Sequence, residues 1–219
     1  ITNPDNTVTG NAAAGSHGFG FWYALPASPT GLSTGQPDLP RNAPLREFSN
    51  NVAHTNRRGG LHVDDGPRPD GTTETVFYAP RTDPADGNTA VVADFTRFTA
   101  WKHPGRAIWL RGRDHRLSDA VVADNAIGAT FASSETFVED ALFVGESANN
   151  AGTIFGDAPR RGYEFYDGRV GADRVTFANF TAAGSIPSSG LGFLRNNGFS
   201  VSTANFAGEV TFLNANRYY

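Results

Sequence analysis

The chain has 219 residues and a formal net charge of −4, with 18% charged and 39% hydrophobic residues. This composition excludes an intrinsically disordered tail, and no run of about 18 apolar residues indicates a transmembrane helix. The acidic balance argues against nucleic acid, which requires a basic face, and the absence of cysteine excludes disulfides and thiolate metal sites.

A short apolar template recurs along the chain between clusters of Gly, Asn, Asp and Pro. In chain order, its copies lie at residues 13–23, 48–63, 95–110, 117–131, 138–143 and 177–195. Leu117 falls 22 positions after Phe95, and Val138 falls 21 positions after Leu117. One such coil cannot bury its inner face alone, whereas stacked coils pair every backbone group with the coils above and below. We therefore predict an all-β solenoid with coils of roughly 22 residues.

The template predicts two inward ladders of stacked side chains. The first would contain Phe48, Phe95, Leu117, Val138 and Phe177. The second would contain Trp22, Trp109, Phe131 and Phe193. A β-sandwich also has many short strands, but its strands need not share a template at a fixed offset. Residues 24–44, 64–90 and 145–162 interrupt the template, and we expect them to form long loops that shape whatever is bound.

Acidic residues recur at equivalent positions of neighbouring coils. The register places Asp119 under Asp140 and Asn125 under Glu146, with Asp124 beside the second column. Glycosidic hydrolysis by the common route needs two carboxyl groups about 5 to 9.5 Å apart, which neighbouring coils can supply. Stacked oxygens would also suit Ca²⁺, the one cofactor the pattern allows. The alternative is that these carboxylates point outward and cap turns.

His54 occupies the same template column as Trp101 and is followed by Arg57 and Arg58. It is a candidate general acid or base, with a hydrogen-bonded ladder histidine as the alternative. Trp101 offers a face on which a sugar could stack.

Four arginines are candidates for holding an anionic substrate. They are Arg57, Arg58, Arg111 and Arg195, the last two at equivalent template positions. Guanidinium forks suit the carboxylates of an acidic glycan, although they could equally neutralise acidic residues of the chain itself.

An ordered series of segments carries a resemblance that spans nearly the whole chain. The segments are residues 1–4, 11–15, 21–23, 29–31, 50–54, 60–61, 107–112, 123–128, 130–132, 142–147, 165–168, 176–177 and 192–194. The series resembles the hyaluronan-depolymerising family of the cell migration-inducing and hyaluronan-binding protein and the transmembrane cell-surface hyaluronidase, and also fibrocystin-like proteins. The resemblance implies a right-handed parallel β-helix in an extracellular or cell-surface protein.

Three functions remain open at this point. The first, implied by the resemblance, is a hydrolase that depolymerises hyaluronan or a related acidic polysaccharide. The second is a carbohydrate-binding or adhesion solenoid without catalysis. The third is a structural protein whose uncapped coils stack end to end into filaments. The chain lacks methionine, so we expect residues 1–219 to be one β-helix domain of a processed chain or of a longer solenoid.

Overall fold

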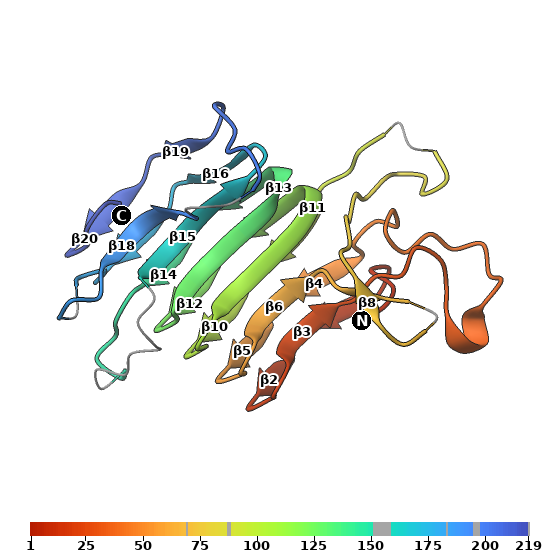
Figure 1. The fold of residues 1–219 in the computed structure, drawn as a ribbon, viewed down its shortest axis with the longest axis horizontal. Coiled ribbons are helices and arrows are strands. Elements are labelled where there is room, and N and C mark those ends of the chain that lie inside the picture. Colours follow the sequence, from red (N-terminus) through yellow and green to blue (C-terminus); the bar gives the residue numbers. More distant parts are fainter. Residues whose placement is uncertain (69, 87–88, 151–158, 183, 195–197, 219) are drawn as a thin grey trace.

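A computed structural model describes residues 1–68, 70–86, 89–150, 159–182, 184–194 and 198–218. The described residues are almost entirely β, the exception being one 3₁₀ turn, η1 (Gly31–Ser33). Parallel strands follow one another along the longest axis of the molecule (Figure 1). This arrangement is consistent with a β-helix. No helix in the described ranges is long and apolar enough to cross a membrane.

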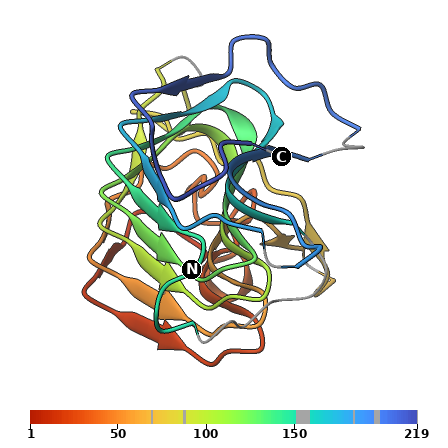
Figure 2. The ribbon, with the colours of Figure 1, turned by 90° about the vertical axis from the view of Figure 1, so that its left-hand side faces the viewer.

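The strands form three parallel rows around a common interior (Figure 2). The first row contains β1 (Thr7–Thr9), β4 (Glu47–Ser49), β9 (Ala93–Thr96), the ends of β11 (Arg106–Ser118) and β13 (Ile127–Glu139), β16 (Val170–Asp173) and β19 (Phe206–Gly208). The second contains β2 (Ala12–Ala14), β5 (Val52–His54), β10 (Thr99–Trp101), β12 (Val121–Ala123), β14 (Leu142–Val144), β17 (Thr176–Ala178) and β20 (Thr211–Leu213). The third contains β3 (Phe19–Tyr23), β6 (Gly59–Val63), the beginnings of β11 and β13, β15 (Arg160–Asp167) and β18 (Ser188–Phe193).

Loops of unequal length separate successive strands of a row. Leu117 pairs with Phe95, and Val138 pairs with Leu117, at the predicted offsets of 22 and 21 residues. Phe95 pairs with Phe48, 47 positions earlier, because the loop that follows β6 intervenes. That loop contains the antiparallel hairpin of β7 (Gly66–Pro67) and β8 (Thr73–Glu74).

Two members of the predicted ladders lie elsewhere. Phe177 pairs with Phe143 in the second row, so its placement with Val138 was wrong. Phe131 pairs with Leu110 and not with Trp109. In a strand, a shift of one residue exchanges the two faces of the sheet.

The second correction makes Trp22 and Trp109 outward residues of the third row. The inward ladder beside them consists of Tyr23, Val63, Leu110, Phe131, Phe165 and Phe193.

The core is a stack of aromatic and aliphatic side chains between the rows. Phe48 and Phe95 are almost fully buried with ring centroids 5.4 Å apart, and Phe143 and Phe177 lie 5.5 Å apart. Burying a side chain of this size contributes about 1.5–3 kcal/mol, so the ladders are the main source of stability.

The corners between rows are built from residues with positive φ. At the corner before the second row, these are Gly10, Asn50, Arg97, Asp119, Asp140, Arg174 and Glu209. At the corner after it, they are Gly15, Thr55, Lys102, Asp124, Asn179 and Asn214. Asn and Asp tolerate the left-handed conformation better than other non-glycine residues. The acidic columns of the sequence therefore coincide with turn positions.

Thr55 is the one β-branched residue among the positive-φ positions of the described chain, with a φ of 56°. Because branching at Cβ makes this conformation unfavourable, we expect Thr55→Asn to stabilise the protein by about 0.5–1 kcal/mol. The midpoint of urea denaturation measures this gain. Thr55→Val keeps the branch and loses the hydroxyl, so an equal gain in that variant would contradict the explanation.

Candidate functional site

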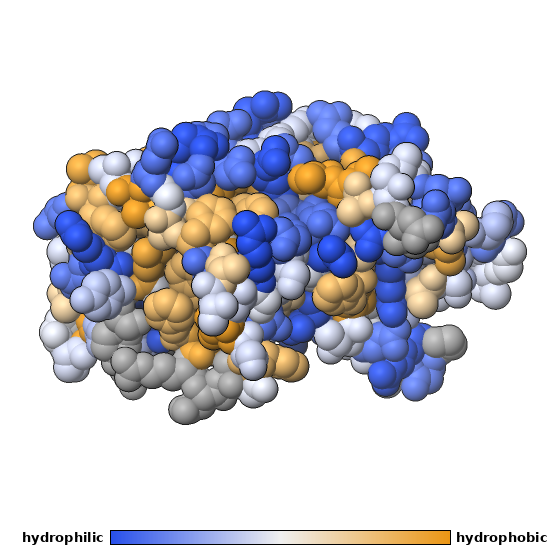
Figure 3. Space-filling model, turned by 90° about the horizontal axis from the view of Figure 1, so that it is seen from above, coloured by the Kyte–Doolittle hydropathy of each residue, from blue (hydrophilic) through white to orange (hydrophobic). Residues whose placement is uncertain are grey.

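A pocket of about 390 Å³ lies outside the third row, between β3, β6 and β11. Its lining residues are Phe19, Arg58, His62, Asp64, Asp65, Gly105, Arg106 and Trp109, and we call it the β6–β11 pocket. Its volume falls within the range of roughly 300–1,000 Å³ that is usual for ligand sites. Seen from above, the N-terminal half of the molecule is mostly hydrophilic, and hydrophobic surface gathers over the C-terminal half (Figure 3).

Aromatic rings follow one another along the third row at this pocket. Trp22, His62 and Trp109 occupy the same outward register position on β3, β6 and β11. Phe19 stacks on His62 with ring centroids 3.8 Å apart, and the His62 and Trp109 rings lie 6.4 Å apart and nearly parallel. Tyr166 of β15 meets Trp109 edge-on at 5.2 Å. The rings form a continuous aromatic track along the molecule.

Asp64 anchors the inner wall of the pocket. Its carboxylate accepts hydrogen bonds from Trp109 Nε1 at 2.9 Å and Arg111 Nε at 2.7 Å, and from the backbone N–H groups of Asp65 and Val76, both at 2.8 Å. Burial raises the pKa of this carboxyl, but the hydrogen bonds outweigh burial and hold the pKa below its usual value. Asp64 is therefore a fixed anion that positions Trp109 and Arg111.

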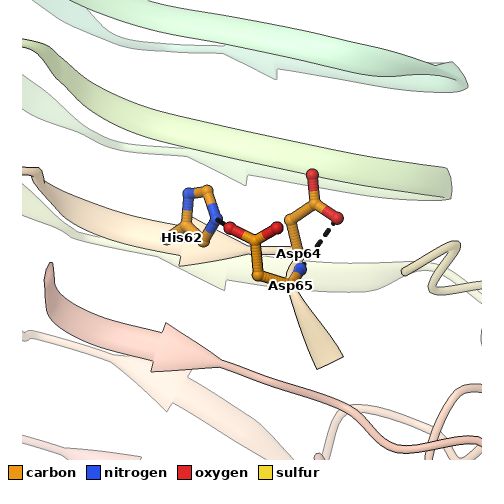
Figure 4. Close-up of side chains that lie close together, drawn as sticks. All are labelled: His62, Asp64 and Asp65. Atoms are coloured by element: carbon orange, nitrogen blue, oxygen red, sulfur yellow. Dashed lines mark hydrogen bonds and ion pairs between the residues drawn. The ribbon is translucent and has the colours of Figure 1, made fainter. Parts of the chain in front are cut away.

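Asp65 and His62 form the second acidic element of the pocket. Asp65 Oδ2 lies 3.0 Å from His62 Nε2, and its carboxylate faces the imidazole while that of Asp64 points away (Figure 4). Burial lowers the pKa of His62, and the hydrogen bond and charge of Asp65 oppose this effect. Asp65 has a φ of 55°, so the chain turns sharply where β6 ends. The pair combines a half-exposed carboxylate with a buried imidazole that can share a proton.

The opposite wall carries Arg106. Its guanidinium donates to Glu164 Oε1 at 2.8 Å and to Thr130 Oγ1 at 2.9 Å. Arg161 also pairs with Glu164, which is fully buried. The Arg106 guanidinium lies 5.3 Å from the centre of the Trp109 ring. The arginine is thus held in place by a buried acidic partner.

His62, Asp64 and Asp65 could in principle hold a metal ion, since one ligand atom from each lies within 4.8 Å of the others. Both oxygens of Asp64, however, already accept N–H bonds, one of them from a guanidinium. Ca²⁺ takes six to eight oxygen ligands, which these three residues do not supply. The chemistry of the donor set therefore favours a proton-sharing role over a calcium site here.

The predicted carboxylate columns lie away from this pocket. Asp119 and Asp140 are exposed at the corner before the second row. Arg174 Nε donates to Asp140 at 2.7 Å, and this bond lowers the pKa of the carboxyl. Asp124 is buried and accepts hydrogen bonds from the N–H and hydroxyl of Ser147. These contacts are those of turn-capping groups.

The other predicted catalytic residues are also separate from the pocket. Glu146 pairs with Arg160 at 3.1 Å in the loop after β14. His54 lies beside Trp101 in the second row, as the register predicted, and the two rings stack 4.6 Å apart.

Of the predicted anion-binding residues, the pocket contains Arg58. Arg111 stands directly behind it in the ion pair with Asp64. Arg57 is exposed next to Arg58, and Arg195 lies outside the described residues. The predictions did not include His62, Asp64, Asp65 or Trp109 of the pocket.

The chain matches known proteins over nearly its whole length. A family model described as the CEMIP beta-helix matches residues 1–61. The cell migration-inducing and hyaluronan-binding protein of Mus musculus is 33% identical over 97% of this chain, and cell surface hyaluronidase CEMIP2 of Homo sapiens is 32% identical over 97%. Fibrocystin-L of Mus musculus is 30% identical over 57% of the chain.

The matched region is a small part of these relatives. The chain spans 19% of the length of the mouse hyaluronan-binding protein, 18% of human CEMIP2 and 3% of mouse fibrocystin-L. The resemblance predicted from the sequence is nevertheless confirmed. This chain is a relative of the family of the cell migration-inducing and hyaluronan-binding protein and the cell surface hyaluronidases, and it matches their β-helix region.

Proposed function

We propose that the β6–β11 pocket binds an acidic polysaccharide of the hyaluronan type. The observation that carries the proposal is the arrangement of guanidinium groups beside aromatic rings in one pocket: Arg58 lies over Phe19 at 5.6 Å, and Arg106 over Trp109 at 5.3 Å. Aromatic rings pack against sugars, and guanidinium groups pair with carboxylates. The printed names of the relatives, which bind or degrade hyaluronan, point to the same ligand.

Hydrolysis of the bound polymer is the second candidate function. The observation that favours it is the proximity of two unlike carboxylates, Asp64 and Asp65, with ligand atoms within 4.8 Å of each other. The Asp65–His62 pair would give a proton to the leaving glycosidic oxygen as the C–O bond breaks. Water would then add its hydroxyl to the anomeric carbon and return a proton to the pair. The fixed charge of Asp64 would stabilise positive charge that develops on the sugar ring.

The family context extends the proposal to the whole chain. We propose a right-handed β-helix with coils of roughly 22 residues plus insertions, in an extracellular or cell-surface protein. End-to-end association of coils remains an alternative use of the same fold. His54, Asp119, Asp124, Asp140 and Glu146 remain catalytic predictions, but the contacts of the last four support structural roles.

Calorimetric titration with short hyaluronan oligosaccharides tests binding at the pocket. We expect Trp109→Ala to weaken binding by about tenfold, because the variant removes one aromatic contact and releases Asp64. Trp101→Ala is the matched control, since Trp101 is a half-buried tryptophan in the second row. Equal losses in the two variants, or a loss only with Trp101→Ala, would contradict this location.

Sizing long hyaluronan by chromatography after incubation separates the two candidate functions. Shortening by the wild-type chain that disappears in Asp65→Asn supports hydrolysis, while binding without any shortening favours a carbohydrate-binding role. Asp140→Asn is the control, because Asp140 is exposed and lies at a corner.

A further inference from the structure

We propose that Arg58 is the residue that makes the pocket select carboxylated sugars. This inference rests on the proposed function of the β6–β11 pocket and specifies which group recognises the uronate. It follows from the pairing of charges around the pocket, because a guanidinium that already has a carboxylate partner has less capacity for a second one.

Two of the three arginines at the pocket are neutralised by acidic residues of the chain. Arg106 pairs with Glu164 at 2.8 Å, and Arg111 pairs with Asp64 at 2.7 Å. Both acidic partners are buried, with 0% and 7% of their side chains exposed. A buried pair that loses one partner leaves an uncompensated charge, so neither arginine is free to turn to a ligand.

Arg58 differs from both. Within the described ranges, no carboxylate lies within 4 Å of its guanidinium, and the residue is exposed. Its backbone N–H is fixed by Gly18 O at 3.0 Å, and its guanidinium lies over the Phe19 ring at 5.6 Å. The side chain is thus anchored at its base and over an aromatic surface, while its hydrogen-bond donors face the pocket mouth without an acidic partner.

His62 provides an internal sensor of what Arg58 binds. The charged groups around its imidazole are Arg58 before β6, Asp64 and Asp65 after it, and Arg106 and Arg111 on β11. Arg58 is the cation that lowers the pKa of His62, after the larger effect of burial. A ligand carboxylate paired with Arg58 would offset that charge and raise the pKa of His62.

The experiment compares two ligands and two variants of the full chain. The ligands are a hyaluronan oligosaccharide and the same oligosaccharide with its uronates reduced to neutral sugars. The variants are Arg58→Gln and, as the matched control, Arg57→Gln, which changes the exposed neighbouring arginine. Calorimetric titration gives the preference for the carboxylated ligand in each protein.

We expect the wild-type chain and Arg57→Gln to prefer the carboxylated ligand by roughly ten- to a hundredfold, the usual strength of a charge-assisted hydrogen bond. Arg58→Gln should bind both ligands equally, with the affinity of the wild-type chain for the neutral one. A preference that survives in Arg58→Gln, or that is lost equally in Arg57→Gln, overturns the role of Arg58 while leaving binding at the pocket intact. A wild-type chain that binds neither ligand overturns the proposed function and this inference together.

An NMR titration of the His62 ring gives a readout that a merely structural role of Arg58 would not produce. The pKa of His62 should rise when the carboxylated ligand binds and stay constant with the neutral ligand. In Arg58→Gln, the pKa of the free protein should already be higher and should not respond to either ligand. A ligand-dependent rise that persists in Arg58→Gln would contradict the inference.

Discussion

Gly112→Ala is expected to destabilise the protein by about 2–5 kcal/mol and to open the wall behind the β6–β11 pocket. Gly112 has a φ of 141°, and a Cβ built there would lie 1.9 Å from the carbonyl oxygen of Tyr78. The unfavourable φ costs roughly 1–2 kcal/mol and overpacking roughly 1–3. Because the obstacle is backbone, it cannot be relieved by rotating a side chain.

The close approach at Gly112 fastens the loop after β6 to β11. Tyr78 forms an isolated parallel bridge with Gly112, and Arg113 N donates to Tyr78 O at 2.9 Å. The same loop supplies Val76 N to the Asp64 carboxylate. Displacing Tyr78 therefore loosens Asp64, and we expect Gly112→Ala to weaken oligosaccharide binding as well as stability.

Two control glycines separate the contributions to this loss in urea denaturation. Gly71 has a φ of 82°, but nothing lies within 4 Å of a Cβ there, so Gly71→Ala should show only the cost of φ. Gly18 has neither a positive φ nor a contact closer than 3.6 Å, so Gly18→Ala should change stability by less than about 0.5 kcal/mol. A Gly112→Ala loss no larger than that of Gly71→Ala would show that Tyr78 can move away at little cost.

The repeat could be predicted from sequence where coils follow one another without insertions. Phe95, Leu117 and Val138 were aligned correctly because two turns of similar length separate them. The alignment of Phe131 with Trp109 failed because the offset there is 21 residues rather than 22. With a side-chain period of two, one residue decides whether a tryptophan is core or surface.

The pocket could not be found from the repeat, because it lies where the repeat is interrupted. Recurring acidic positions such as Asp119 and Asp140 report the left-handed corners that every coil needs. Asp64 and Asp65 occur once, at the junction between β6 and a long loop, and no equivalent position marks them. The available signal was local: two adjacent carboxylates directly after an apolar strand that contains His62.

The stability of the protein is expected to fall steeply as the pH decreases from about 6.5, and His115 is the main cause. This histidine is fully buried in β11, with Nε2 3.1 Å from Tyr78 O and no hydrogen-bond partner for Nδ1 among the described residues. Burial lowers its pKa to about 3, whereas the unfolded chain titrates near 6.5. Above pH 6.5 both states are neutral, so the stability is fully present there. Below that value the unfolded chain alone takes up the proton, and the free energy of unfolding falls by about 1.4 kcal/mol per pH unit towards pH 3.

The interval from pH 6.5 to 4.5 isolates this effect, because the carboxyl groups with lowered pKa values, such as Asp64, lose their protons at still lower pH. Burial also lowers the pKa of His103 and His62, so both add to the slope in the same direction. His115→Phe keeps an aromatic ring against Phe95 and removes the titrating group. Urea denaturation at a series of pH values should therefore give a slope smaller by about 1.4 kcal/mol per pH unit in His115→Phe. An unchanged slope would mean that His115 binds its proton in the folded protein, which requires water or an acidic group to reach Nδ1 beside the loop that Tyr78 holds.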